Sequence, residues 1–176
     1  VETNEVSDYP YEDLNRITGG LRKGELVTVC AGSGIGKSLF CKEVAYDLLQ
    51  QGKTIGYIAL EESVKRTMQG IMSIRLNKPL HLKTTLVDAA ELKDAWEQVA
   101  NTDNLYLYDH FGSTDSDNLL NRIRYMSKAL NCGYIFLDHL SIVVSGMADG
   151  DERRLIDNTM TKLRALVEET GISLVI

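Results

Sequence analysis

A glycine-rich turn between an apolar strand and an amphipathic helix constrains this chain more than any other feature of its sequence. The turn lies in residues 31–38, Ala-Gly-Ser-Gly-Ile-Gly-Lys-Ser, after the apolar run 25–31 and before a helical pattern over 37–51. It fits the phosphate-binding loop pattern, with alanine in place of the first glycine. The alternative is a plain strand-to-helix turn that happens to be rich in glycine.

The residue types in this turn suit a phosphate for physical reasons. Glycines let the backbone turn and aim successive N–H groups at one point, and the helix start adds positive partial charge there. We expect Lys37 to supply a full charge for the β- and γ-phosphates, and Ser38 to offer its hydroxyl to Mg²⁺. The predicted nucleotide-binding residues are Gly32, Ser33, Gly34, Ile35, Gly36, Lys37 and Ser38.

Short apolar runs alternate with longer amphipathic stretches through the rest of the chain, which is typical of βαβ units and a parallel sheet. We therefore expect a three-layer α/β fold with helices on both faces of a mostly parallel, twisted sheet. Trp96 aligns with Leu92 and Val99 on one predicted helix face, which favours packing in the core. Further strands are predicted over 54–60, 105–108, 134–137 and 172–176, and further helices over 63–76, 88–99, 117–130 and 152–170.

Two acidic residues follow predicted strands at the sheet edge where the phosphate loop should lie. Asp138 follows the apolar run 134–137, and a carboxylate at such a strand end can act on Mg²⁺. The alternative is an aspartate that caps a loop. Glu61 follows the strand 54–60, where it could orient and deprotonate an attacking water. The alternative for Glu61 is a solvated acid at a helix start, a place that also suits Glu62.

Charge and hydropathy restrict the partners of the chain. Its 176 residues contain 19 Lys and Arg against 25 Asp and Glu, a net charge of -6. A protein that grips nucleic acid by bulk charge usually has the opposite sign, so any such contact must be local. No apolar run approaches the roughly 18–20 residues of a membrane-spanning helix, so we expect no membrane contact. The three cysteines lack metal-ligand spacing and are predicted to be free thiols of an intracellular protein.

Several segments together resemble a known family. Residues 17–26 (ITGGLRKGEL), ahead of the phosphate loop, look like the opening of RecA-like motor domains. The segments 60–63 (LEES), 137–144 (LDHLSIVV) and 151–163 (DERRLIDNTMTKL) resemble the helicase domain of phage primase–helicases of the T-seven type. Those proteins are related to DnaB-like helicases and to Twinkle. The similarity covers residues 14–176, which we expect to form a RecA-like P-loop NTPase core behind a peripheral segment, 1–13.

The resemblance implies the motor domain of a replicative DNA helicase, which hydrolyses ATP or dTTP with Mg²⁺, translocates on single-stranded DNA and unwinds duplex DNA. It also implies a homo-oligomeric ring, usually a hexamer, in the cytoplasm of a bacterial or phage-infected cell. By motif match, Glu61 would be the catalytic base and Lys37 a catalytic residue, while Ser38 and Asp138 would serve the metal.

The resemblance further implies that the loop after Asp138, roughly residues 139–154, faces the central channel. Its implied DNA contacts are Ser145, Gly146, Arg153 and Arg154. This loop also contains three acidic residues and is not basic, so backbone N–H groups would have to contribute to DNA binding. The alternative is that the loop only contacts a neighbouring subunit.

Two other function classes share the same core. One is a RecA-like strand-exchange or clock-type ATPase that binds DNA or protein without unwinding, and the other is a nucleotide-regulated interaction module. The chain stops in the apolar run 172–176, which suggests a truncated domain because natural termini tend to be exposed and polar. By resemblance, a polar sensor and an arginine finger would follow Ile176, so we expect the 176-residue piece alone to be a poor ATPase.

Overall fold

A parallel five-stranded sheet forms the centre of the fold, in the order β3-β7-β6-β4-β5. This computed structural model describes residues 5–32, 36–100, 102–109, 116–138 and 149–176. Every pair of neighbouring strands in the sheet is parallel, which confirms the predicted α/β fold. The strands are β3 (Leu26–Val27), β4 (Ile55–Ala59), β5 (Leu105–Asp109), β6 (Tyr134–Asp138) and β7 (Ser173–Val175).

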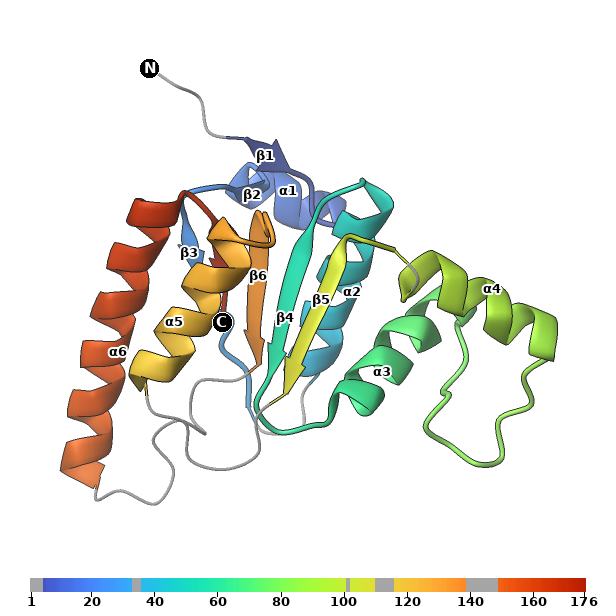
Figure 1. Cartoon of the computed structure of the whole chain (residues 1–176). Helices are drawn as coiled ribbons and strands as arrows, with labels where there is room; N and C mark the ends of the chain where they lie inside the picture. The colour runs from blue at the N-terminus through green and yellow to red at the C-terminus, as the bar shows by residue number, and fades with distance from the viewer. Residues whose placement is uncertain (1–4, 33–35, 101, 110–115, 139–148) are drawn as a thin grey trace.

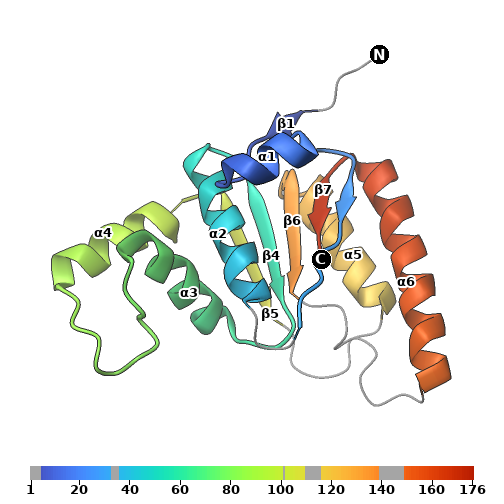
Figure 2. The same ribbon diagram turned by 180° about the vertical axis from the view of Figure 1, so that it is seen from behind.

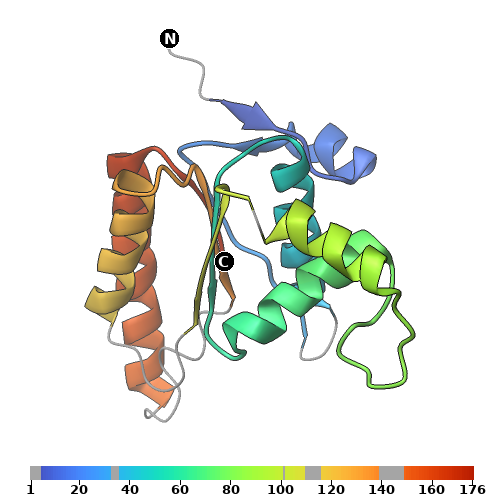
Figure 3. The ribbon, with the colours of Figure 1, turned by 45° about the vertical axis from the view of Figure 1, so that its right-hand side comes forward.

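Helices cover both faces of the sheet and complete the three predicted layers, as Figures 1 and 3 show. One face carries α2 (Lys37–Gln50) and α3 (Val64–Leu76), with α4 (Ala89–Val99) packed on α3. The other face carries α5 (Ser116–Lys128) and α6 (Asp149–Thr170). These bounds confirm the helices predicted from the sequence, except that α6 begins three residues earlier.

Two helix starts have clear local causes in the sequence. Ser63 precedes α3 with extended backbone, and its hydroxyl accepts a hydrogen bond from the Arg66 N–H at 3.2 Å. A capping box joins Asp88 and Glu91 at the start of α4. Such caps satisfy N–H groups that have no partner inside the helix, so they set where α3 and α4 begin.

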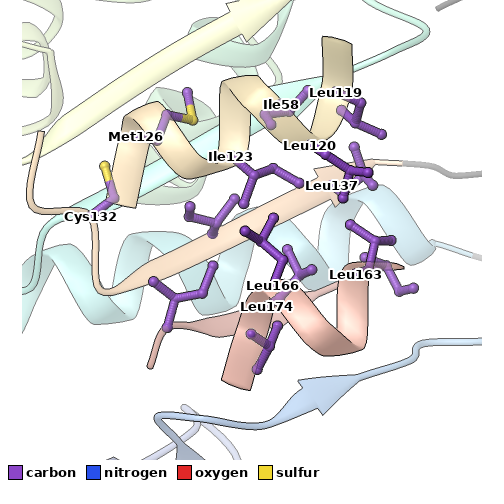
Figure 4. Packing of buried hydrophobic residues seen from close by; sticks show 14 of the residues in the cluster. Ile58, Leu119, Leu120, Ile123, Met126, Cys132, Leu137, Leu163, Leu166 and Leu174 are labelled. Atoms are coloured by element: carbon purple, nitrogen blue, oxygen red, sulfur yellow. The ribbon is translucent and has the colours of Figure 1, made fainter. Parts of the chain in front are cut away.

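Strand β6 is buried on both faces, and its side chains alternate between two apolar clusters. Ile135 and Leu137 face α5 and α6, where they pack with residues such as Ile123 and Leu166 (Figure 4). Tyr134 and Phe136 face α2 instead. A strand covered by helices on both sides must be apolar at nearly every position, which is why residues 134–137 form an unbroken apolar run.

The N-terminal part of the chain folds against the end of the sheet. Strand β1 (Val6–Ser7) pairs antiparallel with β2 (Leu21–Arg22), and α1 (Glu12–Thr18) lies between them in the chain. The sequence predicts a peripheral segment over 1–13, but Tyr9 belongs to the cluster under α2 and is only 6% exposed. The boundary expected after residue 13 also falls inside α1. One buried aromatic residue carries no periodic signal, so the sequence alone could not reveal this packing.

The prediction that Trp96 lies in the core is wrong. Trp96 is 53% exposed and Leu92 is 43% exposed, whereas Val99 on the same helix is buried. Because α4 packs against α3 at the outside of the fold, only the side that carries Ala95 and Val99 is covered. Trp96 and Leu92 instead line an apolar groove of about 650 Å³ between α3 and α4.

None of the helices in the described ranges combines the length and the apolar character that crossing a bilayer requires.

We predict that Tyr134→Phe destabilises the fold by loosening the N-terminal segment. Tyr134 and Ser7 share a hydrogen bond of 2.6 Å between their hydroxyls, and both residues are buried. Removing one hydroxyl leaves the other unpaired, so the free energy of unfolding should fall by about 1–2 kcal/mol in urea titrations. The double variant Ser7→Ala/Tyr134→Phe should cost less than the sum of the two single changes. Strict additivity would contradict this account.

Candidate functional site

The ends of three strands and the start of one helix meet at a single edge of the sheet, the lower edge in Figures 1 and 2. Ala59 at the end of β4 is in register with Asp138 on β6 and with Asp109 on β5. The chain leaves β3 toward this edge and returns as α2. In open parallel sheets, ligands bind outside the carboxyl ends of the strands. This edge is therefore the candidate site.

The predicted phosphate loop leads directly into α2. Gly36 is the residue before the helix and has a φ of 97°, a left-handed conformation that favours glycine. Its carbonyl already accepts the Phe40 N–H at 2.9 Å, so the helical turn begins at once. Lys37 and Ser38 open α2 and are partly exposed, and Gly32 is exposed. Ser33, Gly34 and Ile35 lie outside the described residues.

The first N–H groups of α2 have no acceptor within the helix, as at every helix start. They add positive partial charge at the point where Lys37 brings a full one. This arrangement is a ready site for an anion at the sheet edge, in agreement with the sequence prediction for these residues.

Asp138 is a buried acid at the end of β6, and its side chain is held by a tyrosine. By the alternation along β6 it shares the α2 face with Tyr134 and Phe136. The Tyr57 hydroxyl donates a hydrogen bond of 3.0 Å to its Oδ2. Burial, and then the charge of Asp138, raise the pKa of Tyr57 well above its ordinary value. The phenol therefore stays protonated and remains a donor.

A buried cysteine shows that Asp138 and the start of α2 share one electrostatic environment. Burial, together with the charge of Asp138, raises the pKa of the Cys41 thiol to about 12, and the charge of Lys37 opposes the rise. The fold therefore brings together Lys37 and Asp138, about a hundred positions apart in the sequence. Cys30, Cys41 and Cys132 are all free thiols, as predicted.

The two glutamates after β4 have different surroundings. Glu61 is exposed at the edge, one residue beyond Leu60, whose N–H donates to the Asp138 carbonyl at 2.8 Å. Glu62 is engaged: its Oε1 lies 2.6 Å from Nζ of Lys42 and accepts the Thr67 hydroxyl at 3.1 Å. The structure thus separates two neighbouring acids that the sequence left as alternatives.

Sequence reasoning missed three residues around this turn. Lys42 and Thr67 hold Glu62, and Asp109 at the end of β5 accepts the Val64 N–H at 2.8 Å. Lys42 sits in an ordinary helical pattern and Thr67 in another. Only Asp109 had a usable signal, because it follows an apolar strand as Asp138 does.

The predicted DNA contacts are only partly described. Arg153 and Arg154 are exposed in the early turns of α6, whose start lies toward the same edge of the sheet in Figure 1. Ser145 and Gly146 lie outside the described residues.

The described residues include no group of three or more His, Cys, Asp or Glu side chains that could hold a metal ion. Mg²⁺ does not require such a cage, because it is commonly bound through one or two carboxylates together with substrate phosphates and water. A buried aspartate at the strand end and a serine hydroxyl at the helix start fit that kind of site.

A parallel α/β sheet with a glycine turn ahead of α2 and acids at the strand ends defines the P-loop class of domains. The fold matches the solved structure of another ATPase domain with a TM-score of 0.76 at 17% identity, over 99% of this chain and 64% of that chain. This likeness confirms the predicted RecA-like architecture.

The family follows from the sequence comparisons. The model of the DnaB-like helicase C terminal domain matches residues 8–176, and the chain belongs to this family. The DNA helicase/primase of Enterobacteria phage T3 is 38% identical over 170 residues, which cover 94% of this chain and 30% of that protein. The replicative DNA helicase DnaB of Geobacillus stearothermophilus is 22% identical, over 97% of this chain and 39% of the relative. The chain thus spans well under half the length of either relative.

We predict that Tyr57→Phe lowers the free energy of unfolding by about 2 kcal/mol, because a buried carboxylate loses a hydrogen-bond donor. Urea titration would measure the loss. The matched control is Tyr125→Phe, since Tyr125 is 52% exposed on α5 and its change should stay within about 0.5 kcal/mol. Equal effects of the two substitutions would show that the Tyr57 hydroxyl contributes nothing specific.

Proposed function

We propose that this chain is the ATP-hydrolysing motor domain of a replicative DNA helicase, which translocates on single-stranded DNA and unwinds duplex DNA. The observation that carries the proposal is the convergence of the Lys37 end of α2 with Glu61 and Asp138 at one sheet edge. Membership of the DnaB-like family and the names of the relatives support it.

In this proposal, the residues at the start of α2 bind the triphosphate. Backbone N–H groups of the glycine turn and of the first helical turn donate to phosphate oxygens, and the ammonium group of Lys37 balances their charge. The hydroxyl of Ser38 and the carboxylate of Asp138 hold Mg²⁺ or its water, and the bound ion neutralises charge on the β- and γ-phosphates. ATP is the proposed nucleotide, with dTTP as the alternative.

Glu61 is the proposed general base. Its carboxylate takes a proton from water while the water oxygen attacks the γ-phosphorus, and the bond from that phosphorus to the bridging oxygen breaks. The products are inorganic phosphate and the nucleoside diphosphate. Glu62 does not compete for this role, because Lys42 and Thr67 already occupy its carboxylate.

The DNA-binding part of the proposal concerns the segment between β6 and α6. Arg153 and Arg154 are exposed where α6 begins, and they are proposed to contact phosphates of single-stranded DNA, together with backbone N–H groups near Ser145 and Gly146. We further propose a homo-oligomeric ring, a hexamer, that acts in the cytoplasm of a bacterial or phage-infected cell.

Two substitutions should separate nucleotide binding from hydrolysis. Lys37→Ala should abolish nucleotide binding, because loss of a charged contact of about 3 kcal/mol weakens affinity at least about a hundredfold. Glu61→Gln should keep binding and slow hydrolysis by about 10² or more, since it removes only the base. Fluorescent-nucleotide titration and phosphate release would measure the two effects. Rapid hydrolysis by Glu61→Gln would contradict the base assignment.

The motor function is tested in the intact protein that contains this chain. A helicase should show DNA-stimulated ATP hydrolysis, strand separation on a forked duplex, and rings in particle images. Filaments that pair homologous strands without unwinding would favour a strand-exchange ATPase. Nucleotide binding with no response to DNA would favour an interaction module. Either of these results would overturn the helicase proposal.

A further inference from the structure

Lys42 links the helix that follows the phosphate loop to the turn that carries Glu61. It lies in the second turn of α2, and its Nζ is 2.6 Å from Oε1 of Glu62. The Lys42 side chain is only 10% exposed and that of Glu62 24%. Thr67 on α3 donates its hydroxyl to the same oxygen at 3.1 Å. One carboxylate is therefore held from two helices.

The packing of α3 on α2 leaves room for the Lys42 side chain at a single glycine. A Cβ added at Gly70 would lie 2.9 Å from Cδ of Lys42 and 3.0 Å from both Cε and Nζ. A side chain at this position would therefore force the lysine to move. The stem of Lys42 thus runs directly over the α3 backbone, which limits the directions in which its ammonium group can point.

Backbone contacts fix the same turn on both sides of the glutamates. The Leu60 N–H donates to the Asp138 carbonyl at 2.8 Å, and the Val64 N–H donates to Oδ2 of Asp109 at 2.8 Å. Between these anchors, Glu62 is held through its side chain by Lys42. Glu61 is the adjacent residue, so its Cα can move little while all three contacts persist.

A shielded ion pair is weak support for stability by itself, because desolvation offsets much of the attraction. Its value here is geometric. Lys37 and Lys42 belong to one helix and are separated along its axis by about 7.5 Å. A rigid helix therefore carries the phosphate-binding group at its start and the anchor of the Glu61 turn one and a half turns later.

We infer that Lys42 is a positioning residue for hydrolysis, which acts by holding Glu62 and thereby fixing Glu61 relative to the bound triphosphate. This inference rests on the proposed function, in which Glu61 is the base. A displacement of about 1 Å at a catalytic group can cost about 10² in rate. Lys42 should therefore affect turnover and leave nucleotide affinity unchanged.

The test compares Lys42→Met with the parent in the intact protein, since methionine keeps most of the stem and removes the charge. We expect kcat to fall about 10–100-fold with no change in the nucleotide dissociation constant. Glu62→Gln should show the same loss, and Lys42→Met/Glu62→Gln no greater loss than either single variant. The double variant also removes the unpaired charge, so it keeps the test valid if a single variant fails to fold.

The decisive comparison uses the Glu61→Gln background. There Lys42→Met should cause no further loss of the residual hydrolysis, because Lys42 acts through Glu61. An equal loss in both backgrounds, or a parallel loss of nucleotide affinity, would overturn the inference. Lys128→Met is the matched control: Lys128 pairs with Glu169 between α5 and α6, and its loss should leave turnover unchanged.

Amide hydrogen exchange separates this inference from the proposed function. Lys42→Met should speed exchange in a peptide over residues 60–64, and Lys128→Met should not. If the unsubstituted protein hydrolyses no nucleotide, the motor proposal fails while the exchange result still judges the role of Lys42. Unchanged exchange in Lys42→Met would show that the ion pair does not hold this turn.

Discussion

The parallel register of β4 with its two neighbours is the constraint on which the site depends. Ala59 lies level with both Asp138 and Asp109, so three strands deliver polar residues to the same edge. The alternation along β6 also matters, because a slip of one residue would turn Asp138 away from α2. The apolar clusters on the two faces of the sheet prevent that slip, since it would expose Ile135 and Leu137 to the wrong layer.

Acids gathered at one edge repel one another unless each has its own partner. Asp138 is buried and accepts the Tyr57 hydroxyl. Glu62 is paired with Lys42, and Asp109 accepts a backbone N–H at the start of α3. Local charges near 4 Å interact strongly away from water, so these partners allow the edge to stay acidic and ordered. Glu61 differs from the others by its exposure.

Helix α2 is braced from two directions, which suits an element that begins at the phosphate loop. On one side the N-terminal segment packs on it: Tyr11 stacks on Phe40 with ring centroids 5.8 Å apart and donates its hydroxyl to Glu43. On the other side Lys42 joins it to α3 through Glu62 and Gly70. The position of the helix start is thus set by packing along the helix as well as by the loop itself.

The sequence by itself determined the parallel α/β fold, nearly all helix and strand bounds, the family, and the candidate residues Lys37, Glu61 and Asp138. These features are written in contiguous residues, because a glycine turn, an apolar run and a strand-end acid are local patterns. Only the tertiary structure decided the partners, such as Tyr57 for Asp138, 81 positions away, and Lys42 for Glu62. It also decided that Trp96 is exposed. Those outcomes depend on strand order and on which helix faces are covered, and no local pattern of residues encodes either.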